Sequence, residues 1–342
     1  MASIFLTGAT GYIGGDVLNA LATAHPDYTI RALVRNDAHR DVISKKYPNV
    51  QVVGGSLDDA ETIAREAVEA TVVLNLASTS HLDSVQAIHK TLAGRDGETS
   101  YWIQISGASL LAAGELADKN FTPGEPSDTI FDDLDGVADI HDIVRRHPAR
   151  AVDNFILFTA ANAPSINTAL VIPPIIYGRG RGPANQRSMQ IPDLAKATIE
   201  RGRGLQLGRG QSRWGNVHVQ DLSDLFVKLV EKAVAGISDE RIWNANGLYL
   251  TGVGELTFEE ISRKVTAVAV EQGLIPARDV ETLSPQELDS ILHRATALYG
   301  TNARSKARRA KELLNWTPNH VSLEDDVTRT VELEVARLDE EE

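Results

Sequence analysis

The residues best suited to chemistry stand at the start of the chain, in the run TGATGYIGG of residues 7–15. Gly8, Gly11 and Gly14 recur at intervals of three between an apolar run and an amphipathic stretch, an order that predicts strand, turn and helix. A helix that begins in glycines presents unpaired N–H groups to an anion, and no Cβ atom blocks the approach. We therefore predict that this turn binds the diphosphate of a dinucleotide, with GxxGxxG spacing in place of the general GxGxxG.

The end of the second predicted strand bears on the choice of nucleotide. An NAD site places a carboxylate about twenty residues after the glycines, whereas an NADP site needs a cation for the 2′-phosphate. Counting from Gly14 leads to Val34, Arg35 and Asn36, none of which is acidic. The planar fork of Arg35 suits a phosphate, so NADP(H) is favoured. Asp37 is an acidic residue close to this position, so NAD(H) stays open as the less favoured alternative.

The elements that must position these residues follow from the alternation of apolar runs with amphipathic stretches. Short runs rich in branched residues predict parallel strands, and the stretches between them predict helices on both faces of one sheet. The pattern predicts an α/β fold with a doubly wound parallel sheet. The predicted strands are 3–6, 29–35, 50–53, 71–76, 101–106 and 167–173, and the helices between them include 37–46, 59–69, 81–93 and 139–161.

The regular alternation stops after residue 173. Glycine and arginine then enter flexible segments at 178–183 and 201–210, which we interpret as a pocket-forming region. A helix at 221–234 and an edge strand at 241–245 are expected next. The remaining helices, at 257–272, 284–298, 305–314 and 322–338, predict a smaller lobe. We expect a nucleotide-binding domain of residues 1–178 and 215–246, a substrate lobe of 179–214 and 247–338, and an acidic tail of 339–342.

Composition excludes several classes of protein. The 342 residues carry a net charge of −13, which argues against nucleic acid as a partner. The basic cluster at 304–311 is expected to be a solvated helix surface. No cysteine is present, so there is no disulfide framework or thiolate metal site, and no HExxH or GxSxG motif occurs. No signal peptide or membrane-length apolar run is visible, and we expect a cytoplasmic protein that binds neither metal nor membrane.

With these motifs in view, the chain resembles the extended short-chain dehydrogenase/reductase family, whose glycine turn reads TGxxGxxG. The resemblance covers nearly the whole length. It departs from the family pattern at Ile172, where the family has Arg, at Asn315, where it has Gly, and at Ser56, where it has an acid. The motifs that carry it are NLAS at 75–78, QISGAS at 104–109, IPPIIYG at 172–178, VHVQDL at 217–222 and LLNWTP at 313–318.

The resemblance implies a Rossmann fold that binds NAD(P), with a smaller, mostly helical C-terminal substrate lobe. Both the NmrA-like and the epimerase/dehydratase-like branches fit. Together with the reading of the second strand, it predicts cofactor contacts at Gly8, Thr10, Gly11, Tyr12, Ile13, Gly14, Arg35, Ser56, Leu57, Leu76, Ala77, Ser78, Ser106, Arg150, Pro173, Pro174 and Ile175.

The resemblance breaks at the catalytic motif of the family, YxxxK. No tyrosine of this chain is followed by lysine four residues later. Counting back from the sixth strand places the family's Lys near Arg150 and its Tyr near Arg146 or His147. Arginine cannot move a proton at neutral pH, whereas histidine titrates there, although Pro148 disfavours a continuous helix at this point. The candidate catalytic residues are therefore Ser106, Ser109, His147 and Arg150, the two serines flanking the inert Ala108 at the family's Ser/Thr position.

Substrate contacts are expected from the region after the sixth strand, because ligands bind at the carboxyl ends of strands in open α/β sheets. Gln186, Met189, Trp214 and His218 are the candidates. For His218, in the VHVQDL motif, the alternative to substrate contact is a structural role in packing.

Two functions remain open. The first is an NADP(H)-dependent oxidoreductase that acts on a small carbonyl or conjugated substrate with an atypical proton donor. The second is a non-catalytic NADP(H)-binding redox sensor of NmrA-like type, which would need a protein partner. A nucleotide-sugar epimerase or dehydratase comes third, since it relies on the missing Tyr and Lys. The sequence leaves open whether the chain forms a homodimer.

Overall fold

The computed structural model describes residues 2–95 and 97–341. The starting residue of the predicted nucleotide domain, Met1, and the last residue of the predicted tail, Glu342, lie outside this range. Seven parallel strands form the central sheet in the order β11-β7-β5-β4-β1-β2-β3. They are β1 (Ser3–Thr7), β2 (Thr29–Val34), β3 (Gln51–Gly54), β4 (Val72–Asn75), β5 (Ser100–Ile105), β7 (Ile166–Ile172) and β11 (Leu248–Leu250).

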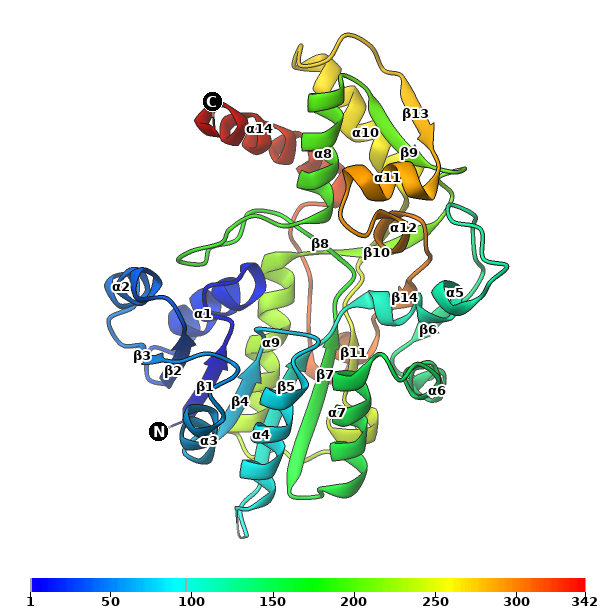
Figure 1. The fold of residues 1–342 in the computed structure, drawn as a ribbon. Coiled ribbons are helices and arrows are strands. Elements are labelled where there is room, and N and C mark those ends of the chain that lie inside the picture. The colour runs from blue at the N-terminus through cyan, green and yellow to red at the C-terminus, as the bar shows by residue number, and fades with distance from the viewer. Residues whose placement is uncertain (1, 96, 342) are drawn as a thin grey trace.

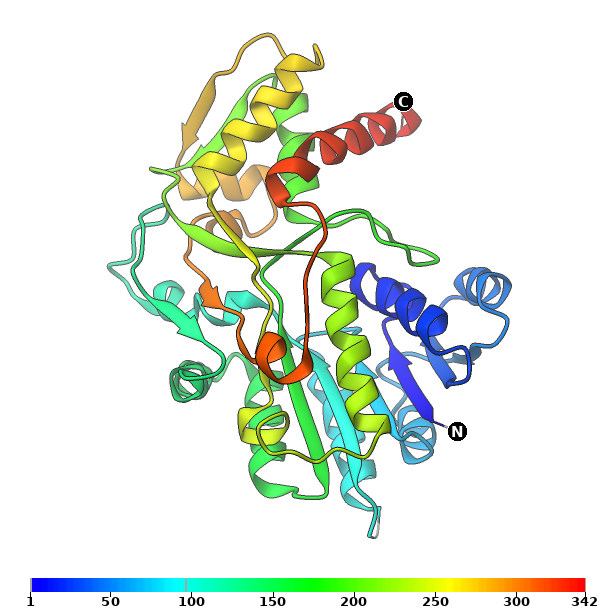
Figure 2. The ribbon, with the colours of Figure 1, turned by 180° about the vertical axis from the view of Figure 1, so that it is seen from behind.

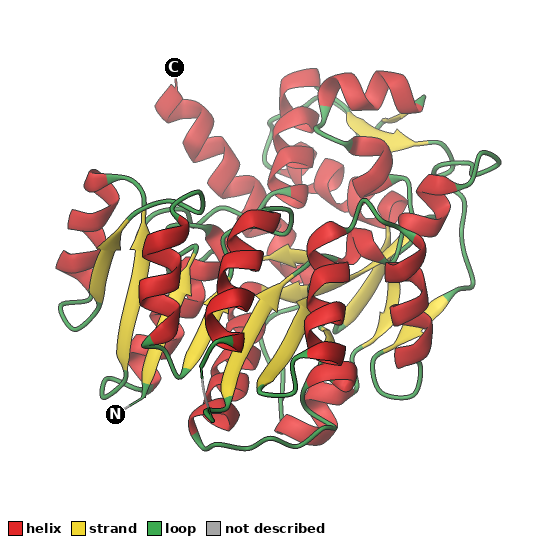
Figure 3. Ribbon diagram, turned by 60° about the horizontal axis from the view of Figure 1, so that its bottom comes forward, coloured by secondary structure: helices red, strands yellow, loops and turns green. Residues whose placement is uncertain are grey.

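Helices cover both faces of this sheet. On one face α1 and α9 pack side by side, and on the other α3, α4 and α7 follow one another (Figures 1 and 2). Figure 3 shows the strands lined up behind the helices of the second face. The layers are those of a doubly wound Rossmann fold, as the alternating sequence pattern predicts. The helices are α1 (Tyr12–Ala24), α2 (Asp37–Lys46), α3 (Ala60–Val68), α4 (Leu82–Ala93), α7 (Ala151–Asn162) and α9 (Val219–Val234).

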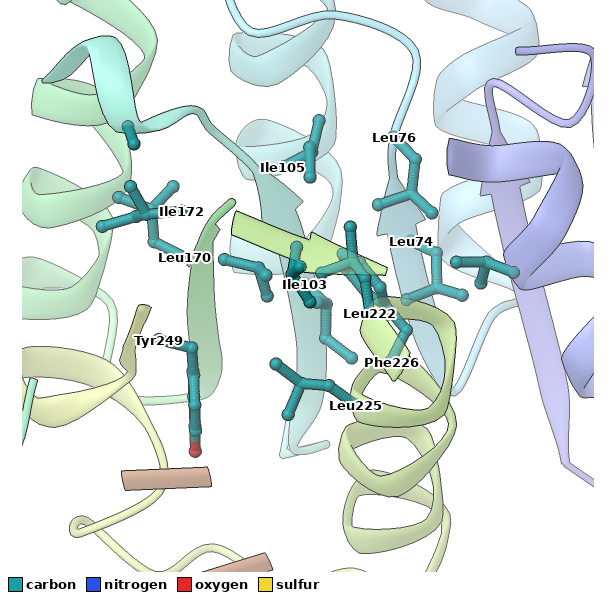
Figure 4. Close-up of a cluster of buried hydrophobic side chains, with 14 of the residues drawn as sticks. Leu74, Leu76, Ile103, Ile105, Leu170, Ile172, Leu222, Leu225, Phe226 and Tyr249 are labelled. Atoms are coloured by element: carbon teal, nitrogen blue, oxygen red, sulfur yellow. The ribbon is translucent and has the colours of Figure 1, made fainter. Parts of the chain in front are cut away.

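The core lies between the central strands and α9. Figure 4 shows apolar side chains of β4, β5 and β7 meeting those of α9. Leu74, Ile103 and Leu170 are fully buried, as are Leu222 and Phe226 across from them. Because both faces of the central strands are covered, their sequences are continuous apolar runs rather than alternating ones.

The C-terminal lobe stands above the carboxyl ends of the strands (Figure 1). Its short strands form two small sheets. One has the strand order β12-β10-β8, and the other pairs β13 with β9. The elements of the lobe are β8 (Ile175–Tyr177), α8 (Gln190–Arg201), β9 (Gly204–Leu207), β10 (Arg213–His218), β12 (Gly254–Thr257), α10 (Phe258–Glu271), β13 (Val280–Leu283), α11 (Pro285–Ile291), α12 (Ala295–Tyr299) and α14 (Leu323–Glu341). The short helix α13 (Arg309–Leu314) instead packs against α9 and β11 of the nucleotide part.

The segment between β5 and α7 makes an excursion to this lobe. It contains α5 (Ala113–Ala117), β6 (Ile130–Asp132) and α6 (Val137–Arg146). The strand β6 pairs in parallel with β14 (Arg304–Lys306), almost two hundred residues further along the chain. Asp133, directly after β6, is fully buried and accepts the backbone N–H groups of Leu250, Arg308 and Arg309. The excursion is thus fastened to the C-terminal part of the chain.

Five local expectations were wrong. The last strand of the sheet is at 248–250 rather than 241–245. Asn244 takes a left-handed conformation (φ 61°), and its side chain accepts the Thr168 N–H. The chain therefore turns at Asn244 before the strand begins. The helix expected at 139–161 is two helices, since Pro148 cannot continue α6. The helix expected at 284–298 also divides, at Arg294 with φ 53°.

The fourth concerns the basic cluster at 304–311, whose first residues form β14 instead of a helix because β6 offers a strand edge. Arg309 in this cluster is buried and donates to the Asp133 carbonyl oxygen, so it is no solvated surface charge. Residues 339–341, expected as an acidic tail, continue α14. Among the described residues, no helix is long and apolar enough to cross a membrane, and no group of three or more His, Asp or Glu could hold a metal ion.

Candidate active site

The turn between β1 and α1 depends on glycine at two positions, Gly8 and Gly14. Gly8 has φ 84°, and a Cβ there would lie 2.7 Å from the Leu76 carbonyl carbon. A Cβ at Gly14 would lie 2.2 Å from the Gly8 carbonyl oxygen. The N–H of Gly11 donates to that same oxygen over 2.9 Å, which closes the turn. Only residues without side chains fit this packing.

The N-terminus of α1 is left open to an anion. Gly11 caps the helix without any side-chain hydrogen bond, and the first turn contains no acidic residue. By contrast, α2 and α3 are each capped by a side chain and carry an acid in the first turn. The N–H groups and the positive dipole end of α1 therefore suit the diphosphate of a dinucleotide. Tyr12 and Ile13, predicted as contacts, supply the first two N–H groups of this helix.

A buried network fixes the strand ends beside this turn. The Thr7 hydroxyl donates to Asn75 Oδ1 over 2.6 Å and accepts the N–H groups of Leu76 and Ala77 at 3.1 and 3.3 Å. The Asn75 amide donates in turn to Gln104 Oε1 over 2.8 Å. Leu76 and Ala77 thus lie directly against the glycine turn, where the sequence predicts cofactor contacts.

The residues expected near adenosine lie at the ends of β2 and β3. Arg35 is exposed, and no described residue pairs with its guanidinium. Asp37 forms an ion pair of 2.7 Å with Arg40, whose Nε also donates to the Val34 carbonyl oxygen. Asp37, the acid that would serve an NAD site, therefore already has a cation beside it. The Arg35 guanidinium has no such partner among the described residues and could bind a 2′-phosphate.

Three further predicted contacts have local roles in turns or in packing. The Ser56 hydroxyl accepts the Asp58 N–H, and Leu57 packs partly buried against the core. The Ser78 hydroxyl accepts the N–H groups of Ser80 and His81 over 3.1 and 3.2 Å. Any contact of these residues with a nucleotide stays a prediction.

Residues 178–189, which we name the strap, cross over the start of α1. Tyr12 Oη donates to the Gly178 carbonyl oxygen over 2.6 Å, and the Asn185 N–H donates to the Thr10 carbonyl oxygen over 3.2 Å. Arg181 binds the buried Asp16 carboxylate of α1 through two of its guanidinium nitrogens, at 2.7 and 3.1 Å. The strap is therefore held against the helix that carries the anion site.

A second polar group lies where β5 ends and α7 begins. It consists of Ser106, Ser109, Arg150 and Asp153, and we name it the Arg150 cluster. Ser106 Oγ donates to Asp153 Oδ1 over 2.6 Å, and Arg150 Nε donates to Asp153 Oδ2 over 2.6 Å. The two terminal nitrogens of Arg150 donate to Ser109 Oγ at 3.3 Å and to Ser106 Oγ at 3.1 Å. Burial raises the pKa of the Asp153 carboxyl above its ordinary value, against the lowering effect of Arg150 and Ser106.

Space is open beside this cluster. A Cβ added at Gly107, between Ser106 and Ser109, would meet no atom within 4 Å. The next residue, Ala108, donates its N–H to the Pro173 carbonyl oxygen over 2.9 Å, which joins this turn to the end of β7. Pro173 and the two following residues predicted as cofactor contacts, Pro174 and Ile175, are buried around this junction.

His147 does not join the cluster. It caps the C-terminal end of α6, and its Nδ1 lies 2.6 Å from the Ile143 carbonyl oxygen of the same helix. Its predicted catalytic role stays untested. The structure therefore brings together three of the four candidate catalytic residues, Ser106, Ser109 and Arg150.

The four predicted substrate residues separate into two groups. Gln186 and Met189 line a cavity of about 830 Å³ between the strap and α14. Trp214 is buried in the C-terminal lobe and donates Nε1–H to the Thr301 carbonyl oxygen over 2.8 Å. His218 is also buried, stacks on His320 at 4.6 Å between ring centres, and has a lowered pKa, chiefly because of burial.

Sequence reasoning missed Asp153 and Asp16, the two buried carboxylates of these sites. A signal existed for Asp153, since it follows Arg150 by three residues, the spacing of a helical ion pair. Asp16 interrupts the apolar stripe of α1, and a charge there needs a buried partner. Neither partner, Ser106 nor Arg181, could be found from sequence spacing alone.

Comparison with known proteins agrees with this architecture. The NmrA-like family matches residues 2–93. The oxidase ucsJ of an Acremonium species is 36% identical over 98% of both chains. Among solved structures, the UDP-glucose 4-epimerase of Thermotoga maritima has a TM-score of 0.63, 15% identity and coverage of 98% of this chain and 99% of that one. The dTDP-glucose 4,6-dehydratase of Bacillus anthracis, in complex with NAD, has a TM-score of 0.65, 14% identity and coverage of 99% and 98%.

The chain belongs to the NmrA-like family. This is an NAD(P)-binding family. The fold of the chain is that of the epimerase and dehydratase structures. The solved structures share the fold, and their low identity carries nothing further about chemistry.

Proposed function

We propose that this protein is an NADP(H)-dependent oxidoreductase that acts on a small carbonyl or conjugated substrate. The observation that carries the proposal is the Arg150 cluster, a buried polar network beside open space at the carboxyl ends of β5 and β7. Open α/β sheets bind their ligands at this edge. The relative named an oxidase supports a redox reaction, although it does not identify the substrate.

The nucleotide would be held mainly by backbone. The N–H groups at the start of α1 suit the diphosphate, and Leu76 and Ala77 border the same turn. A bound nicotinamide nucleotide would supply or accept a hydride at the sheet edge. The chain's own part is then to orient the substrate beside Ser109 and Arg150 and to keep Ser106 in a fixed position against Asp153.

Preference for NADP(H) rests on the cation at the end of β2. Arg35 is exposed and has no described partner, whereas the nearby Asp37 is paired with Arg40. A guanidinium can bind a 2′-phosphate through two parallel hydrogen bonds. In an NAD site, the ribose hydroxyls would bind Asp37, one of whose oxygens already contacts Arg40.

The nucleotide preference is tested by Arg35→Asp, with Lys45→Asp as a control that makes the same charge change on an exposed position of α2. We expect Arg35→Asp to weaken NADPH binding by roughly 10- to 100-fold, the worth of a charge-assisted pair, and to spare NADH. Titration calorimetry measures both affinities. Equal NADPH affinity in wild type and Arg35→Asp would contradict the assignment.

The catalytic part is tested by NADPH oxidation against a panel of aldehydes, ketones, quinones and conjugated enones. Turnover of at least one substrate is expected, and Arg150→Met should lower kcat/KM by at least about 100-fold if the cluster contacts the substrate. Tight NADPH binding with no turnover on any panel member would contradict an enzyme and favour a sensor.

A further inference from the structure

Three hydrogen bonds hold the Arg150 side chain and leave part of its donor capacity unused. Its Nε and one N–H of each terminal nitrogen donate to Asp153, Ser109 and Ser106. Each terminal nitrogen carries a second N–H, which no described residue accepts. The Arg150 side chain is 19% exposed, whereas that of Asp153 is 1% exposed. Two N–H groups of this partly exposed guanidinium are therefore left without a described acceptor, and we name them its outer edge.

We propose that this outer edge binds the carbonyl oxygen of the substrate and stabilises the negative charge that develops there, and that the substrate is an α,β-unsaturated carbonyl compound. This inference rests on the proposed function and narrows it. The space beside Gly107, next to both serines, is where the substrate carbonyl would lie.

The choice of substrate class follows from the chemistry of arginine. Guanidinium stays charged at all ordinary pH values, so it stabilises an anion but donates no proton. The hydroxyl hydrogen of Ser106 is committed to Asp153, which is fully buried. Reduction of a simple ketone creates a strongly basic alkoxide, which requires a proton donor in the same step. The one hydroxyl hydrogen of the cluster without a described acceptor is that of Ser109, which accepts from Arg150. Serine is too weak an acid to be an efficient proton donor at neutral pH.

Conjugate reduction avoids this requirement. The substrate takes up a hydride from NADPH at its β-carbon, forming a C–H bond while the C=C electron pair shifts to make an enolate. The charge rests on oxygen, against the two outer N–H groups of Arg150. The enolate then takes a proton from water at its α-carbon. The sum is one hydride and one proton added across C=C, with NADPH oxidised to NADP⁺.

Asp153 acts on this chemistry as a positioning residue. Its two oxygens bind Arg150 Nε and Ser106 Oγ, each over 2.6 Å, which fixes the plane of the guanidinium at the start of α7. Loss of this carboxylate would leave the cation in place but free to rotate. Loss of the Asp153 carboxylate should therefore weaken substrate binding less than loss of Arg150 does.

The anion site is tested directly with 4-nitrophenol, whose phenolate oxygen imitates an enolate and whose ionisation is visible in its absorption spectrum. With NADP⁺ present, wild type should bind the phenolate and raise the ionised fraction of bound phenol at a fixed pH. Arg150→Met should bind phenolate at least about tenfold more weakly and remove the spectral change. Arg145→Met, an exposed arginine of α6, should behave as wild type.

Two further variants guard against misfolding. Arg150→Met combined with Asp153→Asn removes both charges and leaves no buried unpaired carboxylate, and it should give the same loss. Asp153→Asn alone should give a part of the loss. If Arg150→Met weakens NADP⁺ binding but leaves phenol ionisation unchanged, Arg150 holds the ribose and the inference is wrong. Wild type that binds no phenolate overturns it as well.

Regiochemistry distinguishes this inference from the proposed function. Cinnamaldehyde and 3-phenylpropanal differ only in the C=C bond. We expect cinnamaldehyde to give 3-phenylpropanal, with deuterium from labelled NADPH at the β-carbon, and 3-phenylpropanal itself to be unreactive. Formation of cinnamyl alcohol, or reduction of 3-phenylpropanal, would overturn the inference and leave an oxidoreductase. No turnover of any conjugated or simple carbonyl would overturn the proposed function itself.

Discussion

The glycine turn and the Arg150 cluster lie at the same edge of one sheet and are built in opposite ways. At Gly8, Gly11 and Gly14 the groups proposed to bind the diphosphate are backbone N–H groups, and side chains are absent. In the Arg150 cluster the interacting groups are side chains whose identities all matter. A site made of backbone needs a fixed glycine pattern. A site made of side chains can change its members, as the missing YxxxK motif illustrates.

The largest effect should come from adding a side chain to the backbone site. Gly14→Ala would place a Cβ 2.2 Å from the Gly8 carbonyl oxygen. We expect a loss of more than about 3 kcal/mol in unfolding free energy and at least about 100-fold in NADPH affinity, because a backbone clash cannot relax by side-chain rotation. Gly94→Ala, at a helix end with φ −85°, is the control. Urea unfolding and calorimetry measure both quantities, and normal NADPH binding by Gly14→Ala would show that the turn tolerates side chains.

An effect of intermediate size is expected at Asp133, a side chain that is bound by backbone N–H groups. Burial raises the pKa of Asp133 from 3.8 to about 6, despite its three backbone donors. Since the folded state binds this proton more tightly than the unfolded state, the contribution of Asp133 to stability grows as pH falls from about 6 to about 4, by about 3 kcal/mol.

The measurement is the pH dependence of unfolding free energy between pH 4 and 7, on wild type and Asp133→Asn. The stability of wild type relative to Asp133→Asn should rise toward acid. Asp128→Asn, an exposed position on the same excursion, should track wild type throughout. A difference that shrinks toward acid would mean that the Asp133 carboxyl has a lowered pKa.

The smallest effect concerns the side chains behind the backbone site. The Ser223 hydroxyl donates to the buried Asp16 carboxylate over 2.7 Å, beside the Arg181 ion pair of the strap. Ser223→Ala should cost about 1–2 kcal/mol in unfolding free energy, the worth of one hydrogen bond to a charge. NADPH affinity should change less than about twofold. The exposed Ser290→Ala is the control, and a larger affinity loss would show that side chains share in forming the anion site.

Much of the fold could be predicted because both faces of the central sheet are buried. Six strands were expected close to their observed bounds, from β1 at 3–7 to β7 at 166–172, since covered parallel strands are continuous apolar runs. The short strands of the C-terminal lobe were not visible. β6 and β14 have three residues each and are held by pairing with one another across a long separation. Such pairing leaves no local pattern.

The two sites differ in the same respect. The glycine turn is local, so spacing alone revealed it. The Arg150 cluster joins Ser106 to Asp153 across 47 positions, and only Arg150 and the serines could be proposed from their alignment with the family motif. His147 was chosen for its titration, yet its ring binds its own helix. Chemical suitability therefore selected one residue, His147, whose side chain does not join the other three candidates.

The pairing of β6 with β14 has a practical consequence for handling this protein. A shortened version that ends after β11 would keep every strand of the main sheet but would remove the partner of β6 and two of the backbone donors to Asp133. A buried carboxylate with only the Leu250 N–H left as a donor would then stand beside a bare strand edge, which invites aggregation. Expression of the nucleotide-binding half should therefore retain the sequence through α13, or replace residues 107–136, the part of the excursion before α6, with a short linker.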